Sequence, residues 1–167
     1  MRVAALLLLL GVLAGCGGGG GGLPDDPPPG DTMTPAEHTL AREVFALVNE
    51  ARAQVQLPPV VWSEAAAGVA FEHAADMRVR DFYTHENPDG VSPCERLIAR
   101  EIPMSACGGE NIARSNPTSQ DVMAAWMGSA DHRANVLSPG VTHLGVGVHL
   151  ASAGPWWVQD FYRYTGE

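Results

Sequence analysis

The chain has 167 residues, with 19 acidic residues, 10 arginines and no lysine, and its formal net charge is −9. This acidic balance, without any basic run, argues against nucleic-acid binding and against electrostatic attachment to anionic lipids. The length suits one domain of ordinary size, together with the non-globular segment that the N-terminus indicates.

The N-terminus predicts an export signal. Arg2 precedes an apolar run, Val3 to Val12, which matches the apolar region of a signal peptide and falls short of the roughly 20 residues that span a bilayer. Leu13-Ala14-Gly15-Cys16 resembles a lipobox, where a peptidase cuts before a cysteine that is then lipidated. We therefore predict that residues 1–15 are a signal peptide and that Cys16 carries a lipid. The alternative is an ordinary signal peptide followed by an incidental cysteine.

A tether follows the predicted anchor. Residues 16–33 contain a run of six glycines after Cys16 and then a proline-rich stretch, and neither composition can bury a core. The folded domain is therefore expected to be residues 34–167. The residue after Cys16 is glycine, not the aspartate of an inner-membrane retention signal. We accordingly expect the outer membrane or the cell surface rather than the inner membrane.

The two remaining cysteines indicate a disulfide. With Cys16 lipidated, Cys94 and Cys107 form an even pair in a compartment that oxidises thiols. We predict that they are bonded to one another. Two buried free thiols are the alternative.

The first half of the domain predicts helices. Thr34-Pro35-Ala36-Glu37 is a capping box with proline at the first helical position, and apolar residues at helical spacing follow it. Leu57-Pro58-Pro59 ends that helix. Ser63 is expected to cap a second helix that runs to about Arg80. His73, on its apolar face, is expected to be a core histidine.

Two further helices and a turn are predicted before the chain changes character. Asn87-Pro88-Asp89-Gly90 is typical of a turn, and Ser92-Pro93-Cys94-Glu95 is a second capping box that opens a short helix to about Arg100. A fourth helix is expected from about Thr118. Three tryptophans are expected in the core, namely Trp126, Trp156 and Trp157.

The C-terminal part predicts strands. Residues 144–150 alternate with a period of two, residues 156–162 do so in part, and Ala153-Gly154-Pro155 between them favours a hairpin. Residues 110–113 are a candidate third strand. Helices first and antiparallel strands late indicate an α+β fold.

Short motifs in a fixed order give a more specific prediction. They are Leu47-Val48-Asn49-Glu50-Ala51-Arg52, Ala74-Ala75-Asp76-Met77, Thr84-His85, Gly109-Glu110-Asn111-Ile112-Ala113, the run from Trp126 to Leu137, and Leu144-Gly145-Val146-Gly147. Together they resemble the CAP superfamily of cysteine-rich secretory proteins, antigen-5 venom allergens and plant pathogenesis-related proteins, and most of all its bacterial SCP-like extracellular branch. The resemblance covers residues 40–162. It implies a three-layer α–β–α sandwich around a small, mainly antiparallel sheet.

The same resemblance implies a cavity lined by two histidines and two acids, which here are His85, Glu95, Glu110 and His132. Each has a structural alternative. Glu95 sits where a capping-box glutamate would bond a backbone amide, and Glu110 is a candidate partner for an arginine such as Arg114. His132 could lie at a helix end, and His85 could be a loop histidine bonded to the backbone.

These four side chains offer nitrogen and oxygen ligands suited to a divalent ion, zinc above all. With only two histidines the ion would be weakly bound. We therefore expect a cell-surface module that binds a small apolar or cell-envelope ligand and carries a weak metal site. A metal-assisted hydrolase with Glu110 as its general base is one alternative. A structural or adhesive surface domain without a ligand is the other.

Overall fold

The computed structural model describes residues 32–164, so the predicted signal peptide, the lipid at Cys16 and nearly all of the tether lie outside the described residues. The helices are α1 (Pro35–Gln54), α2 (Glu64–Val79), α3 (Pro93–Ala99), α4 (Ser119–Gly128) and α5 (Ala130–Val136). The strands are β1 (Val61–Trp62), β2 (Met104–Arg114), β3 (His143–His149) and β4 (Trp156–Tyr164). No helix within residues 32–164 is both long and apolar enough to cross a bilayer.

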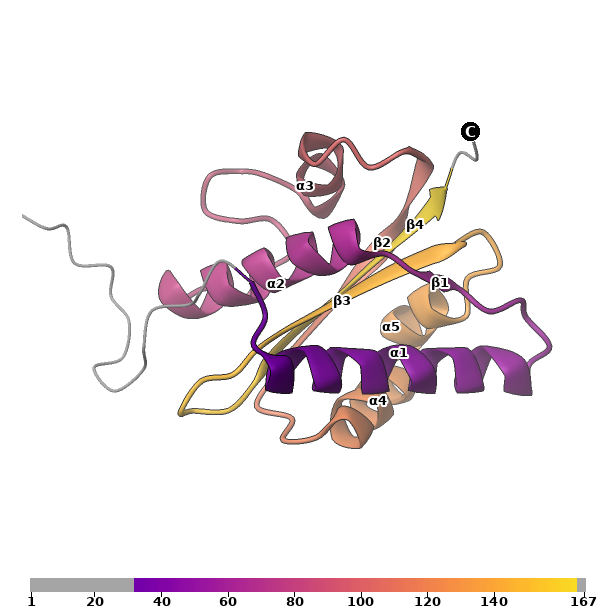
Figure 1. Cartoon of the computed structure of the whole chain (residues 1–167), viewed down its shortest axis with the longest axis horizontal. Coiled ribbons are helices and arrows are strands. Elements are labelled where there is room, and N and C mark those ends of the chain that lie inside the picture. The colour runs from indigo at the N-terminus through magenta and orange to yellow at the C-terminus, as the bar shows by residue number, and fades with distance from the viewer. Residues whose placement is uncertain (1–31, 165–167) are drawn as a thin grey trace, which may run out of the picture.

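The strands form one sheet in the order β1-β3-β4-β2 (Figure 1). The β3–β4 and β4–β2 pairs are antiparallel, whereas β1 pairs parallel to β3, with Val61 opposite His143. The sheet is therefore mixed, although most of its pairing is antiparallel as expected. The α+β prediction is confirmed. The candidate strand at residues 110–113 is one end of the much longer β2.

The helix starts follow the sequence signals. Thr34 Oγ1 accepts a hydrogen bond from the Glu37 amide, and the Glu37 carboxylate accepts one from the Thr34 amide at 2.7 Å. Ser92 and Glu95 make the same reciprocal pair at the start of α3. The predicted fourth helix is confirmed as α4, which Thr118 caps. The chain turns at Ser129, and the separate helix α5 that follows was not predicted.

The helices cover both faces of the sheet, and β4 alternates between two cores. Trp157 and Phe161 pack with α1, α4 and α5, whereas Val158 and Tyr162 pack with α2 or α3 on the opposite face. The three tryptophans predicted to be in the core are all buried. Because the alternation has period two, Asp160 points to the same face as Val158 and Tyr162.

Helix α2 lies very close to the sheet. A Cβ atom at Gly145 would collide with the backbone of Ala66 and Ala67, and one at Gly147 would collide with the α2 backbone one turn later. Only glycine permits this approach. The approach brings buried side chains of α2, His73 among them, close to that face of the sheet.

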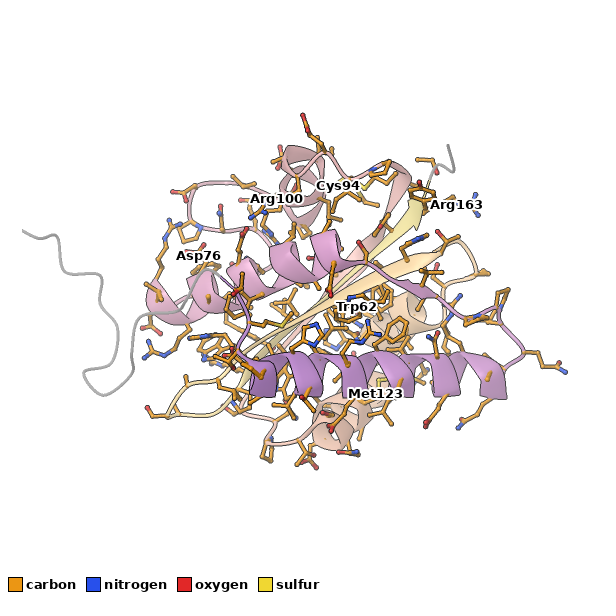
Figure 2. The ribbon with its side chains drawn as sticks, viewed as in Figure 1. Trp62, Asp76, Cys94, Arg100, Met123 and Arg163 are labelled. Carbon is orange, nitrogen blue, oxygen red and sulfur yellow. A yellow bond between two sulfur atoms is a disulfide. The ribbon has the colours of Figure 1, made fainter. Side chains whose placement is uncertain are left out.

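Helix α3 is fastened to the sheet by a covalent bond. Cys94 in α3 (Figure 2) and Cys107 in β2 form a disulfide, with their Cα atoms 5.8 Å apart. The predicted disulfide is confirmed. It fixes the start of α3 beside the part of β2 that leads into Glu110.

Candidate functional site

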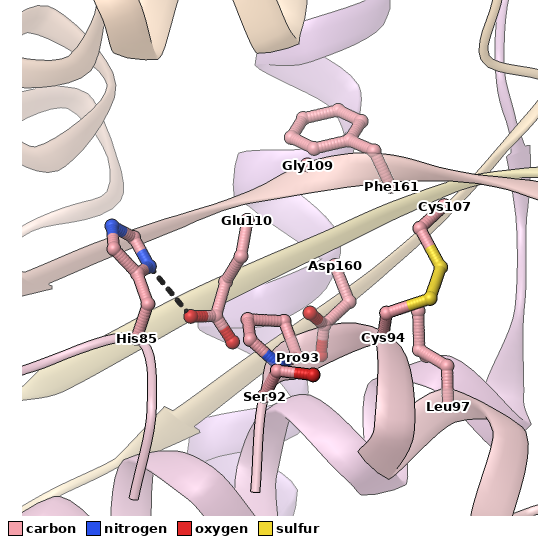
Figure 3. A pocket seen from close by; sticks show the side chains of 10 residues that line it. All are labelled: His85, Ser92, Pro93, Cys94, Leu97, Cys107, Gly109, Glu110, Asp160 and Phe161. Atoms are coloured by element: carbon pink, nitrogen blue, oxygen red, sulfur yellow. Dashed lines mark hydrogen bonds and ion pairs between the residues drawn. A yellow bond between two sulfur atoms is a disulfide. The ribbon is translucent and has the colours of Figure 1, made fainter. Parts of the chain in front are cut away.

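Glu110 in β2 is the centre of a buried polar cluster. Its Oε1 accepts a hydrogen bond from Nδ1 of His85 at 2.7 Å (Figure 3). Its Oε2 accepts one from Nη2 of Arg96 at 2.5 Å. His73 Nε2 lies 3.9 Å from Oε1. One carboxylate thus connects the sheet with α2, with α3 and with the loop between these two helices.

A bulge in β2 aims this carboxylate. The pairing of β2 with β4 shifts between Cys107 and Gly109, and such bulges re-aim the side chains beside them. Gly109 has a φ of +100°, and the side chain of Asn135 fills the place that a Cβ there would take. Asn135 Nδ2 donates to the backbone carbonyl of Glu110 at 3.2 Å. The strand is therefore held from α5 at the residue that carries the acid.

Arg96 is the cation of the cluster, and the sequence analysis did not single it out. It lies in α3, and its Nη1 donates to the carbonyls of His85 at 2.9 Å and Val91 at 3.1 Å. Arg114, the suggested partner of Glu110, instead stacks on Tyr83, with its guanidinium carbon 4.8 Å from the ring centre. The alternative that Glu110 pairs with an arginine is therefore observed, but the partner is Arg96 and not Arg114.

His85 is the accessible member of the cluster. Its side chain is 51% exposed, whereas that of Glu110 is 1% exposed. Nδ1 faces Glu110, and the other ring nitrogen points away from the carboxylate (Figure 3). A carboxylate that accepts from one ring nitrogen fixes the orientation of the imidazole and leaves Nε2 able to meet a ligand.

His132 lies in α5. Within residues 32–164 its ring makes no hydrogen bond to His85, but it feels the charge of that residue. Its backbone carbonyl accepts a hydrogen bond from Asn111 Nδ2 at 3.1 Å. Burial lowers the pKa of its imidazole, and the charge of His85 lowers this pKa further. The two rings are therefore within electrostatic reach of one another, and His132 is not among the residues that line the pocket beside Glu110.

Glu95 has a different role in this structure. Its exposed carboxylate accepts hydrogen bonds from the amide of Ser92 at 2.8 Å and from its hydroxyl at 2.6 Å. Both bonds lower the pKa of Glu95, and the bond from the Ser92 hydroxyl has the larger effect. The capping alternative is thus the one observed, and the carboxylate of Glu95 is committed to the start of α3.

A pocket of about 270 Å³ opens beside the cluster. Its apolar wall includes Pro93, Leu97 and the Cys94–Cys107 disulfide, and its polar groups include His85, Glu110 and Asp160 (Figure 3). An apolar wall with a few convergent polar groups is the usual character of a ligand site.

Asp160 is the second acid of the site, and the sequence analysis missed it. It lies in β4 directly opposite Glu110 in the strand register and is 0% exposed. Burial raises the pKa of its carboxyl well above the ordinary value, and the negative charge of Glu110 raises it further. The sequence analysis expected residues 156–162 to alternate only in part, so the inward position of Asp160 in this strand was not recognised.

The four predicted residues do not fit a metal as a set. Both oxygens of Glu110 accept from charged or polar side chains, and Glu95 caps α3. Residues 32–164 contain no group of three or more His, Cys, Asp or Glu side chains arranged to hold an ion. Only the imidazoles of His85 and His132 remain as candidate ligands, so zinc binding stays a prediction.

Comparisons with known proteins agree with this architecture. The profile of the cysteine-rich secretory protein family, CAP, matches residues 45–161. YkwD of Bacillus subtilis, an uncharacterized protein, is 33% identical over 120 residues, which cover 72% of this chain and 46% of YkwD. The B. subtilis membrane protein YlbC, also uncharacterized, is 31% identical over 66% of this chain and 32% of its own length. The chain therefore spans less than half the length of these relatives.

Solved structures show the same fold. An extracellular protein of Bacillus anthracis that contains an SCP domain has a TM-score of 0.72 and 29% identity, over 79% of this chain and 44% of that one. An outer surface protein of Borrelia burgdorferi has a TM-score of 0.70 and 17% identity, over 80% of this chain and 97% of that one. At that identity the second likeness shows the fold alone.

Proposed function

Because the chain belongs to the cysteine-rich secretory protein family, we propose that it is an extracellular module whose pocket binds a small apolar ligand or the apolar end of a cell-envelope molecule. The pocket beside Glu110 carries this proposal. Its volume of about 270 Å³ is just below the usual range of ligand sites, roughly 300 to 1,000 Å³. The occupant is therefore a compact group or one end of a longer molecule.

The chemistry of the pocket supports binding more than hydrolysis. A general base needs a carboxylate that can accept a proton from a substrate. Glu110 is buried, and both of its oxygens already accept hydrogen bonds, from Arg96 and His85. His85 would instead orient the polar end of a ligand whose apolar part lies against Leu97 and Pro93.

Filling the pocket tests the proposal. We expect Leu97→Phe to occupy part of the space beside the disulfide and to lower ligand capture. Ile98→Phe is the matched control, because Ile98 is the next residue of α3, is 59% exposed and does not line this pocket. The purified full-length chain would be exposed to a cell-envelope lipid extract and examined by native mass spectrometry. Capture that is absent from the wild type, or equal in both folded variants, would contradict the proposal.

We also propose that a lipid on Cys16 holds the module at a membrane surface. The lipobox-like Leu13-Ala14-Gly15-Cys16 supports this, and the similar B. anthracis protein is extracellular. The expressed chain should enter the detergent phase of a phase-partitioning assay, and Cys16→Ser should move it to the aqueous phase. A wild-type protein that stays aqueous would argue for simple secretion.

A further inference from the structure

Asp160 is a buried carboxyl group that receives no hydrogen bond from residues 32–164. Its residue is 0% exposed, and neither of its oxygens has a donor among the residues that the structure describes. The great majority of buried polar side chains in proteins have a partner. An ionised carboxylate in this place would be desolvated and unpaired, which is among the most unfavourable arrangements for a charged group.

The groups around Asp160 show what can satisfy it. Glu110 lies opposite on β2, and the facing residue of β3 is Gly145, which has no side chain. Arg96 from α3 acts on Asp160 only through its charge. Its guanidinium donates to Glu110 and to backbone carbonyls instead. Directly opposed residues of antiparallel strands have their Cβ atoms about 4.5–5.5 Å apart, so the polar side chain that faces Asp160 across the sheet is another carboxyl group, that of Glu110.

Two facing carboxyl groups are compatible only when one of them carries a proton. Each oxygen of Glu110 already accepts a hydrogen bond, one from His85 and the other from Arg96. Asp160 has no such donors, and burial without donors favours the neutral form. The proton therefore belongs on Asp160, whose O–H would donate to Glu110. Figure 3 shows both carboxyl groups at the same pocket.

We propose that Asp160 is a neutral carboxylic acid that donates a hydrogen bond to Glu110 and is thereby a positioning residue for the Glu110–His85 pair. Glu110 is then held from three sides: by Asp160 within the sheet, by Arg96 from α3 and by His85 from the loop. His73 approaches from α2 at 3.9 Å. This inference concerns the site of the proposed function, but it holds or fails in the ligand-free protein.

The protonation of Asp160 can be observed directly. Carbon-13 NMR of the full-length chain, labelled at aspartate carboxyl carbons, would follow each signal between pH 4 and pH 8. The Asp160 signal is identified by its loss in Asp160→Asn. We expect it to keep the position of a protonated acid through neutral pH. A signal that titrates near the ordinary value of about 3.9 for aspartate would overturn the proposal.

Two variants separate positioning from mere folding. The amide of Asp160→Asn can still donate to Glu110, whereas Asp160→Ala cannot. Nitrogen-15 NMR of the His85 ring reports whether Nδ1 still carries the proton that faces Glu110. We expect the wild-type tautomer in Asp160→Asn and a mixture of tautomers in Asp160→Ala. If Asp160→Ala is unfolded, Asp160→Ser is used in its place. The positioning role would be refuted if His85 kept its wild-type tautomer in a folded variant whose residue 160 cannot reach Glu110.

Discussion

The guanidinium of Arg96 and the carboxylate of Glu110 meet at 2.5 Å, and their side chains are only 12% and 1% exposed. Removing one partner of such a pair leaves the other charge buried and uncompensated. We therefore expect Arg96→Met to lower the free energy of unfolding by about 3–5 kcal/mol, as measured by urea denaturation.

The effect of Arg96→Met can be compared with that of a surface variant and with that of a double variant. Arg100, near the end of the same helix, pairs with Glu72 at the surface, with both side chains about half exposed. Arg100→Met should therefore cost at most about 1 kcal/mol. Glu110→Gln combined with Arg96→Met should cost less than the sum of the single changes, because the uncompensated charge is gone. Equal losses for Arg96→Met and Arg100→Met would show that the buried pair has no special weight.

The disulfide should stabilise both the fold and the site. Cys94 and Cys107 are 13 residues apart in sequence, and closing a loop of this size stabilises a domain by about 3 kcal/mol in the chain-entropy estimate. We expect Cys94→Ser/Cys107→Ser to lose about that much stability in denaturant. Reduction of the wild type with a thiol reagent should reproduce the loss. A stability unchanged by either treatment would mean that α3 is held by its other contacts alone.

Most of the fold could be predicted because its signals are local. The capping boxes at Thr34 and Ser92 each use residues three apart in sequence, and both helices start where these boxes predict. Strand β1 was not predicted, because two residues carry no periodic pattern and its pairing with β3 is a long-range contact. The break at Ser129 was missed because its side chain makes no capping hydrogen bond, so it leaves no capping signal.

The site was predictable in part, and mainly through resemblance. His85 and Glu110 are brought together from 25 residues apart, which no local pattern encodes. Arg96 could have been found, because the predicted disulfide between Cys94 and Cys107 places its neighbourhood beside Glu110. Asp160 needed the full register of β4, which only the paired sheet supplies.

Zinc binding, if it occurs, should depend on the two imidazoles and not on Glu95. Calorimetric titration of the apo-protein with zinc is expected to show weak binding that is lost in His85→Ala/His132→Ala. Glu95→Ala should bind as the wild type does, because its carboxylate caps α3. Glu110→Gln should weaken binding about 10- to 100-fold, as expected for an acid that orients a liganding histidine. Equal heats for wild type and double variant would eliminate the metal site.

Acid should destabilise the protein partly through His73. Burial lowers the pKa of its imidazole, Nε2 lies 3.0 Å from the carbonyl of Thr84, and Nδ1 has no partner within residues 32–164. Below the unfolded value of about 6.5 the unfolded chain binds a proton that the folded chain resists. Stability should therefore fall as pH drops from about 6.5, by up to roughly 1.4 kcal/mol per unit from this one group.

A glutamine at position 73 provides the matched comparison, because its amide can donate to the Thr84 carbonyl but cannot be protonated. Urea denaturation of wild type and His73→Gln would be measured at intervals between pH 7.5 and pH 4.5. The difference in unfolding free energy should shift in favour of His73→Gln as the pH falls, while the other titrating groups, being common to both proteins, cancel. Asp160 is one of these common groups. Its raised pKa makes stability fall as the pH rises, which is opposite to the effect of His73, because a group that binds its proton more tightly when folded loses its stabilising effect as the pH rises. A difference that stays constant across this range would mean that the imidazole of His73 is charged, or neutral, equally in the folded and unfolded chain.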